Sequence, residues 1–90
     1  MAKLLGLLFS PDAEADLDEI HAPLFDEVLG RLQLLRRFPE LGKAMSAPYS
    51  GLRVTTVGLF RIIYRNTPRA IEVLYVRHYK RRLPLPAAER

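Results

Sequence analysis

The pattern of hydrophobic and polar positions divides the chain into a helical half and a strand-like half. Residues 4–9 form a short apolar run that predicts a strand. Ser10 suits a helix N-cap and Pro11 suits the first helical position, so an amphipathic helix is expected to begin there and to be interrupted at Pro23. Apolar residues then recur at helical spacing over residues 25–38, which predicts a second helix.

After Gly51 the period of the pattern changes from about three and a half residues to two. Residues 40–50 form a connecting loop rich in proline and glycine, and strands are predicted at residues 52–57, 59–66 and 71–78. Short connections between consecutive strands indicate an antiparallel meander, and the two helices are the available cover for its apolar face. We therefore predict an α+β fold with the order β-α-α-β-β-β and two helices packed on an antiparallel sheet.

The size of the chain sets the number of domains. Ninety residues are enough for one small core. We predict a single domain over residues 1–82, followed by an extended or frayed tail at residues 83–90 that contains spaced prolines. The N-terminal apolar run is shorter than a signal-peptide core, and no stretch approaches the length of a membrane span, so a soluble cytoplasmic protein is expected.

Composition narrows the chemistry. The chain has no cysteine, which excludes disulfides, thiolate zinc sites and thiol catalysis. It has no glycine-rich phosphate loop and no metal-ligand spacing, so neither a cofactor nor a metal is predicted. Residues 1–45 hold five basic side chains against eight acidic ones, whereas residues 46–90 hold nine against two. This asymmetry favours a polyanion or an acidic protein as partner.

Arginines recur along the predicted strands. Arg61 and Arg65 are in phase with each other on one side of their strand, and Arg53 points to one side of its own strand. Arginine resists desolvation and prefers anionic oxygen, so this row indicates a phosphate-binding surface on the open face of the sheet. The alternative is that an individual arginine pairs with an acid of the first helix, although the acids of the helices, Asp16 among them, resemble a solvated face.

A second group of candidates follows the last predicted strand. His78 could transfer a proton near neutral pH, Tyr79 could stack on a base, and the cations Lys80, Arg81 and Arg82 could stabilise negative charge on a phosphate. A histidine that is merely structural or exposed is the alternative. Residue types alone thus indicate that cationic side chains bind an anion here, and they leave acid–base catalysis open.

The arrangement of these elements resembles the RelE/ParE superfamily of toxins from type II toxin–antitoxin and plasmid stabilization systems. The similarity covers nearly the whole chain: the opening strand, the helix from Ser10 to Ile20, Pro39 with Gly42, Leu52-Arg53, residues 57–64, and residues 71–76 followed by His78. The resemblance implies a cognate antitoxin as partner.

Two activities follow from the resemblance. RelE-type members are ribosome-dependent mRNA endonucleases; in that case Arg61 matches the strand arginine that grips phosphate, and His78 with Tyr79 matches a pair at the end of the last strand. ParE-type members are DNA gyrase poisons without a nuclease site. A non-catalytic nucleic-acid-binding or protein-binding module is a third reading.

Departures from the family pattern bear on both activities. The helices are shorter than in ParE-like members, residues 44–50 hold no acid that could act as a base, and no aromatic residue closes the tail. From the resemblance as a whole we predict a type II toxin, and of the two activities we prefer ribosome-dependent mRNA cleavage. The predicted catalytic residues are Arg61, His78 and Tyr79. The predicted nucleic-acid contacts are Arg53, Arg65, Lys80, Arg81 and Arg82.

Overall fold

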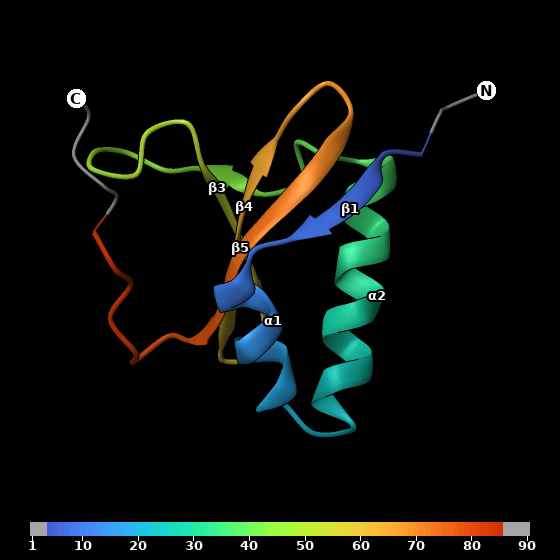
Figure 1. Cartoon of the computed structure of the whole chain (residues 1–90), viewed down its shortest axis with the longest axis vertical. Coiled ribbons are helices and arrows are strands. Elements are labelled where there is room, and N and C mark those ends of the chain that lie inside the picture. Colours follow the sequence, from blue (N-terminus) through green and yellow to red (C-terminus); the bar gives the residue numbers. More distant parts are fainter. Residues whose placement is uncertain (1–3, 86–90) are drawn as a thin grey trace.

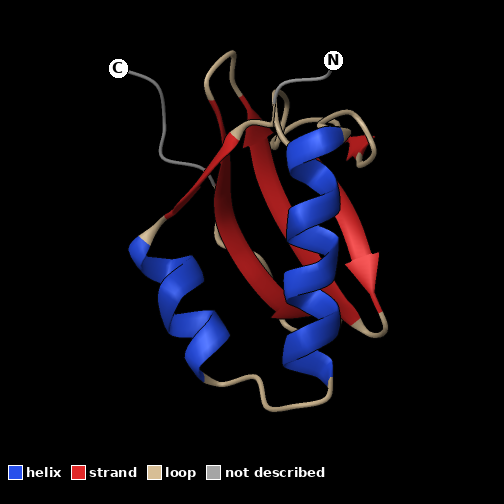
Figure 2. Cartoon of the chain, turned by 90° about the vertical axis from the view of Figure 1, so that its right-hand side faces the viewer, coloured by secondary structure: helices blue, strands red, loops and turns tan. Residues whose placement is uncertain are grey.

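A five-stranded sheet carries two helices on one of its faces (Figures 1 and 2). The computed structural model describes residues 4–85. Its elements are β1 (Gly6–Phe9), α1 (Pro11–Asp18), α2 (Leu24–Arg37), β2 (Lys43–Ala44), β3 (Arg53–Val57), β4 (Phe60–Asn66) and β5 (Ala70–His78). The predicted fold class is confirmed. No helix among these residues is long and apolar enough to cross a membrane.

The sheet has the strand order β1-β5-β4-β3-β2, in which β3, β4 and β5 form the predicted antiparallel meander. Strand β1 adds to β5 in parallel, with Gly6 opposite Ala70. The short strand β2 pairs with β3 inside the segment predicted to be a loop. The sheet is therefore mixed, and β5, the last strand in sequence among the described residues, lies between β1 and β4.

Helix α1 begins where the sequence predicts, and its first residues also seal the edge of β5. The Ser10 hydroxyl oxygen accepts a hydrogen bond from the Ala13 amide at 3.0 Å, as an N-cap does. The same hydroxyl donates to the Leu74 carbonyl at 2.7 Å. One side chain thus starts the helix and fixes it to β5.

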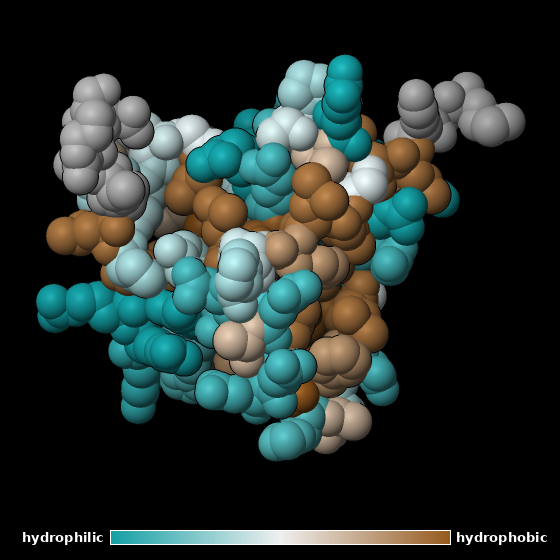
Figure 3. Space-filling model, in the orientation of Figure 1, coloured by the Kyte–Doolittle hydropathy of each residue, from teal (hydrophilic) through white to brown (hydrophobic). Residues whose placement is uncertain are grey.

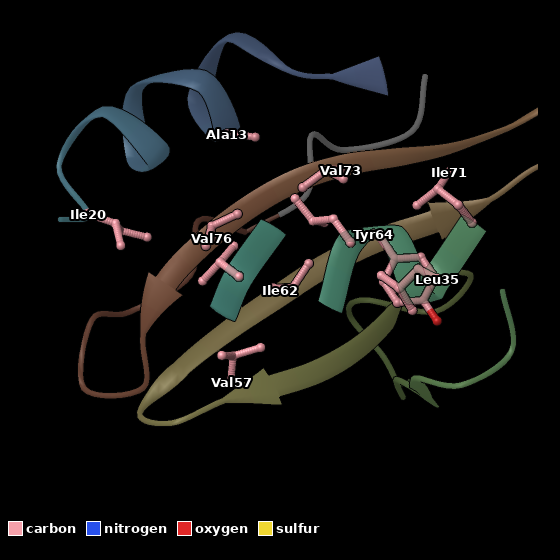
Figure 4. Packing of buried hydrophobic residues seen from close by; sticks show 11 residues of the cluster. Ala13, Ile20, Leu35, Val57, Ile62, Tyr64, Ile71, Val73 and Val76 are labelled. Carbon is pink, nitrogen blue, oxygen red and sulfur yellow. The ribbon is translucent and has the colours of Figure 1, made fainter. Parts of the chain in front are cut away.

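The hydrophobic core lies between the helices and the sheet (Figure 4). Facing residues of a β-ladder share one side of the sheet, so the pair Ile62 and Val76 marks the helix face, and the pair Ile63 and Tyr75 marks the open face. The buried cluster on the helix face consists of Ala13, Ile20, Val28, Leu32, Leu35, Val57, Ile62, Tyr64, Ile71, Val73 and Val76. A register shift between Ile63 and Tyr64 makes β5 one residue longer than its partner there.

The open face is partly covered by residues 79–85, which we call the C-terminal segment. Figure 1 shows it on the side of the sheet away from α2. Ile63 lies on this face yet is fully buried, and Leu83 is only 6% exposed. The Tyr49 hydroxyl donates to the Leu83 carbonyl at 3.3 Å. The predicted tail begins at Leu83, and its residues 86–90 lie outside the described residues.

Candidate functional site

Arg61 and Arg65 lie on the open face of the sheet, as their phase predicts. Arg61 faces Arg77 across the ladder, and Arg65 faces Glu72. The Arg61 guanidinium donates through Nη2 to the Arg81 carbonyl at 2.7 Å, while its Nε is buried and has no hydrogen-bond partner within residues 4–85. Arg65 pairs with Glu72 at 3.0 Å, and about half of its side chain is exposed. Of these two arginines, only Arg61 is left with a buried donor unsatisfied.

Arg53 lies on the other side of the sheet, because it faces Tyr64, which belongs to the core. Its Nη1 donates to the Gly42 carbonyl at 2.7 Å. The Tyr64 hydroxyl accepts from the Gly42 amide at 2.9 Å and donates to the Pro39 carbonyl at 2.7 Å. Burial raises the pKa of Tyr64, and the Gly42 hydrogen bond and the Arg53 charge oppose that rise. Arg53 and Tyr64 together hold the turn that follows α2.

His78 ends β5 on the helix face, opposite Phe60. Its Nδ1 accepts a hydrogen bond from the Lys80 amide at 3.1 Å, so the neutral ring carries its proton on Nε2. The ring stacks on Tyr79 with centroids 4.9 Å apart and meets the edge of Phe60 at 5.5 Å. Because Arg61 faces the residue before His78, the side chains of Arg61 and His78 leave the sheet on opposite faces.

The cations after β5 are exposed. The Lys80 ammonium lies 5.9 Å from the centre of the Tyr79 ring. Arg81 reaches back toward α1, with its Nη1 3.9 Å from carboxylate oxygens of Asp16 and Glu19. Hydrophilic side chains gather where β5 leaves the sheet, at the lower left of the space-filling view, and hydrophobic ones lie over β1 and α2 on the right (Figure 3). Three exposed cations, Lys80, Arg81 and Arg82, therefore follow β5 directly.

Asp16 is the residue that sequence reasoning misplaced. It is 4% exposed, accepts from the Val76 amide at 2.9 Å and pairs with Arg77 Nε at 3.2 Å. The prediction that Asp16 lies on a solvated face is wrong, whereas the alternative that one arginine pairs with an acid of the first helix holds for Arg77. The signal was available, because Asp16 lies three residues after Ala13 and four before Ile20, on the buried stripe.

A cleft of about 230 Å³ lies beside this ion pair, lined on one side by Asp16, Glu19 and Ile20 and on the other by Phe60, His78 and Arg81. His78 is thus the candidate proton-transfer group that faces a cleft. Within residues 4–85, no group of three or more histidine, aspartate or glutamate side chains could hold a metal ion.

The predicted residues therefore form two groups. Arg61 and Arg65 lie on the open face, whereas His78 and Tyr79 lie at the strand exit with the exposed cations. The turn after β5 links them, since the Arg81 amide donates to the His78 carbonyl and the Arg81 carbonyl receives Arg61. Arg53 joins neither group.

Comparison with known families and structures gives one consistent result. Residues 7–83 match the family described as ParE toxin of type II toxin–antitoxin system, parDE. A comparison with curated proteins gives no match. The fold is similar to a chain of the RelBE2 toxin–antitoxin complex of Mycobacterium tuberculosis, with a TM-score of 0.74 and 21% identity over 84% of this chain and 99% of that one.

Two further solved structures share the fold. A chain of the chromosomal ParDE system of P. aeruginosa gives a TM-score of 0.67 and 18% identity, over 83% of this chain and 96% of that one. The YoeB/ParE toxin of Agrobacterium tumefaciens gives 0.72 and 15%, over 82% and 98% of the two chains. The predicted membership of the RelE/ParE superfamily is confirmed.

Proposed function

Because this chain belongs to the ParE toxin family of type II toxin–antitoxin systems, we propose that it inhibits growth by binding DNA gyrase and does not cleave RNA. The observation that carries this proposal is the separation of Arg61 from His78. Their side chains leave neighbouring strands on opposite faces of the sheet. Cleavage through a 2′-hydroxyl needs an acid, a base and a cation around a single phosphate, within hydrogen-bond reach.

The partners of the other strand arginines support the same proposal. Arg53 donates to a backbone carbonyl, and Arg65 pairs with Glu72. The Arg53 contact holds the turn after α2, and the Arg65 contact joins β4 to β5. Residues 44–50 also supply no carboxylate that could act as a base. What remains is a cationic surface suited to binding a macromolecule.

We propose an antitoxin as the neutralising partner and the cytoplasm, where gyrase works, as the location. The matched structures include a chain of the RelBE2 toxin–antitoxin complex and a chain of the ParDE toxin–antitoxin system. The net charge of +4, concentrated in residues 46–90, suits an acidic antitoxin, because complementary charge speeds and orients association.

Ribosome-dependent mRNA cleavage is the second candidate, and one observation favours it. His78 and Tyr79 stack on each other at the strand exit, next to the exposed cations Lys80, Arg81 and Arg82. A ring pair of this kind could hold a base while the histidine donates a proton from Nε2.

Two assays on the purified protein separate these candidates. The proposal expects the protein to block DNA supercoiling by gyrase and to leave mRNA intact on translating ribosomes. Growth inhibition should survive His78→Ala, and the matched control is His21→Ala, an exposed histidine between the helices.

Other outcomes would contradict the proposal in different ways. Cleaved mRNA, lost in Arg61→Ala and His78→Ala variants that still fold and bind antitoxin, would identify a nuclease. A protein that is harmless on induction would be a passive binding module.

A further inference from the structure

The C-terminal segment is held on the sheet at several separate points. The Arg81 carbonyl accepts from Arg61, and the Arg81 side chain lies 3.9 Å from acids of α1. Further along, the Leu83 carbonyl accepts from Tyr49, and the Leu83 side chain is buried. Leu85 is 76% exposed, so the segment leaves the surface there. Residues 79–85 thus form a strap that begins at β5 and crosses the open face.

Arg61 is poorly satisfied beneath this strap. Among the residues that the structure describes, its guanidinium makes one hydrogen bond, to a neutral carbonyl, and its buried Nε makes none. Guanidinium offers five donors in a planar fork and binds most strongly to two anionic oxygens at once. A phosphate group therefore satisfies Arg61 better than the Arg81 carbonyl does.

The charges at Arg61 also favour an anion, in place of the Arg81 carbonyl, as its partner. Arg61 faces a second arginine, Arg77, across the ladder, and residues 73–85 contain no acid. A bound anion is attracted by the full charge of Arg61, whereas the neutral Arg81 carbonyl offers only a dipole.

We propose that the C-terminal segment is an autoinhibitory strap that a phosphate group displaces from Arg61. The phosphate oxygens take the Arg61 donors from the Arg81 carbonyl, and residues 79–85 then lift from the open face. Phosphate binding and strap release are therefore coupled, and each favours the other to the same extent. The phosphate belongs either to a nucleic-acid backbone or to a free phosphate compound. This inference concerns Arg61 and the strap and does not depend on gyrase as the target.

A binding titration tests the coupling from the side of the strap. The probe is a fluorescein-labelled single-stranded RNA decamer, followed by fluorescence anisotropy. Tyr49→Phe removes the hydrogen bond to Leu83 and should tighten probe binding by roughly threefold to tenfold, since the closed strap lowers the competent fraction. Leu83→Ala should act in the same direction. Tyr75→Phe removes a hydroxyl from the same face that makes no hydrogen bond to the strap among the residues the structure describes, and it should leave the affinity unchanged.

Substitutions in the Tyr49→Phe background identify the residue beneath the strap. Arg61→Ala should abolish the gain in affinity. Arg65→Ala, which removes the same charge from the same face, should preserve it, because Arg65 pairs with Glu72. If Tyr49→Phe and Leu83→Ala leave the affinity unchanged, or if Arg65→Ala cancels the gain as fully as Arg61→Ala does, the proposal is wrong.

Hydrogen exchange tests the coupling from the side of the ligand. Saturating inorganic pyrophosphate, or the RNA decamer, should speed amide exchange in residues 79–85 of the wild type and not in Arg61→Ala. Release by pyrophosphate assigns the site to free phosphate compounds, and release by RNA alone assigns it to a nucleic-acid backbone; both support the strap. Unchanged or slower exchange while the probe is bound would refute it. Since supercoiling is measured separately, a failure here leaves the gyrase proposal untouched.

Discussion

Loss of the Asp16 carboxylate should destabilise this fold strongly, because that carboxylate is the acceptor of a buried ion pair and of a strand amide. Asp16 and the Arg77 side chain are 4% and 9% exposed. The Arg77 Nε lies 3.2 Å from one Asp16 oxygen and 3.3 Å from the other, and the Val76 amide lies 2.9 Å from Oδ2. Asp16→Asn keeps the shape and one acceptor oxygen but removes the nearer acid partner of Arg77, whose charge is then left with the exposed Asp12 carboxylate, 3.9 Å from its Nη2.

The magnitude follows from burial. Removing one partner of a buried ion pair costs about 3–5 kcal/mol, because the remaining charge is uncompensated. Asp16→Asn falls at the lower end, about 3 kcal/mol, since its amide oxygen still accepts from Val76. Asp16→Ala lies nearer 5 kcal/mol because the Val76 amide also loses its acceptor. A domain of this size has a free energy of unfolding of about 5–14 kcal/mol, so either variant removes a large fraction of it.

Urea unfolding followed by far-UV circular dichroism measures this loss, since the chain has no tryptophan to report by fluorescence. The matched control is Asp18→Asn on the exposed side of α1, which should change the free energy of unfolding by less than about 0.5 kcal/mol. Adding Arg77→Met to Asp16→Asn should recover part of the loss, because the buried charge that has lost its nearer partner is removed. A loss below about 1 kcal/mol for Asp16→Asn, with no recovery in the double variant, would refute this reasoning.

Two further substitutions probe α2 and the turn after it. Tyr64→Phe leaves the Gly42 amide and the Pro39 carbonyl without their partner, so the free energy of unfolding should fall by about 1–3 kcal/mol near pH 7, whereas the exposed Tyr79→Phe should be neutral. Burial raises the pKa of Tyr64 above its unfolded value near 10, so stability should fall as pH rises from about 10 through the folded pKa; alkaline unfolding curves should show this component in the wild type and not in Tyr64→Phe. Gly30→Ala should raise the free energy of unfolding by roughly 0.5–1 kcal/mol, and with it the urea midpoint, because nothing lies within 4 Å of the added methyl group. A lowered midpoint would contradict the open space seen at that position.

Features that depend on neighbouring residues were predictable from the sequence. Ser10 and Pro11 start a helix through local hydrogen bonding and a fixed φ angle, and Pro39 follows the end of α2 for the same kind of reason. The two-residue period after Gly51 predicted β3, β4 and β5, because strand alternation is a local property.

Features that depend on distant residues were not predictable. Pairing of Gly6 with Ala70 joins segments at opposite ends of the chain, and two residues of β2 are too few to show a period. The phase of Arg61 was correct, yet the acceptor of its hydrogen bond is a backbone carbonyl, which no side-chain pattern reveals. Arg53 was assigned to a phosphate-binding row because alternation does not say which side of a strand faces the helices.

The position of β5 between β1 and β4 has a consequence for synthesis of the protein. Translation begins at the N-terminus, so β5 is made after the other four strands of the described sheet, yet it pairs with β1 on one edge and with β4 on the other. The core cannot close on a nascent chain that ends before Ala70, because such a chain lacks Ile71, Val73 and Val76. Products that terminate before β5 therefore cannot form this fold, and any activity that depends on the fold arises only after β5 has been made.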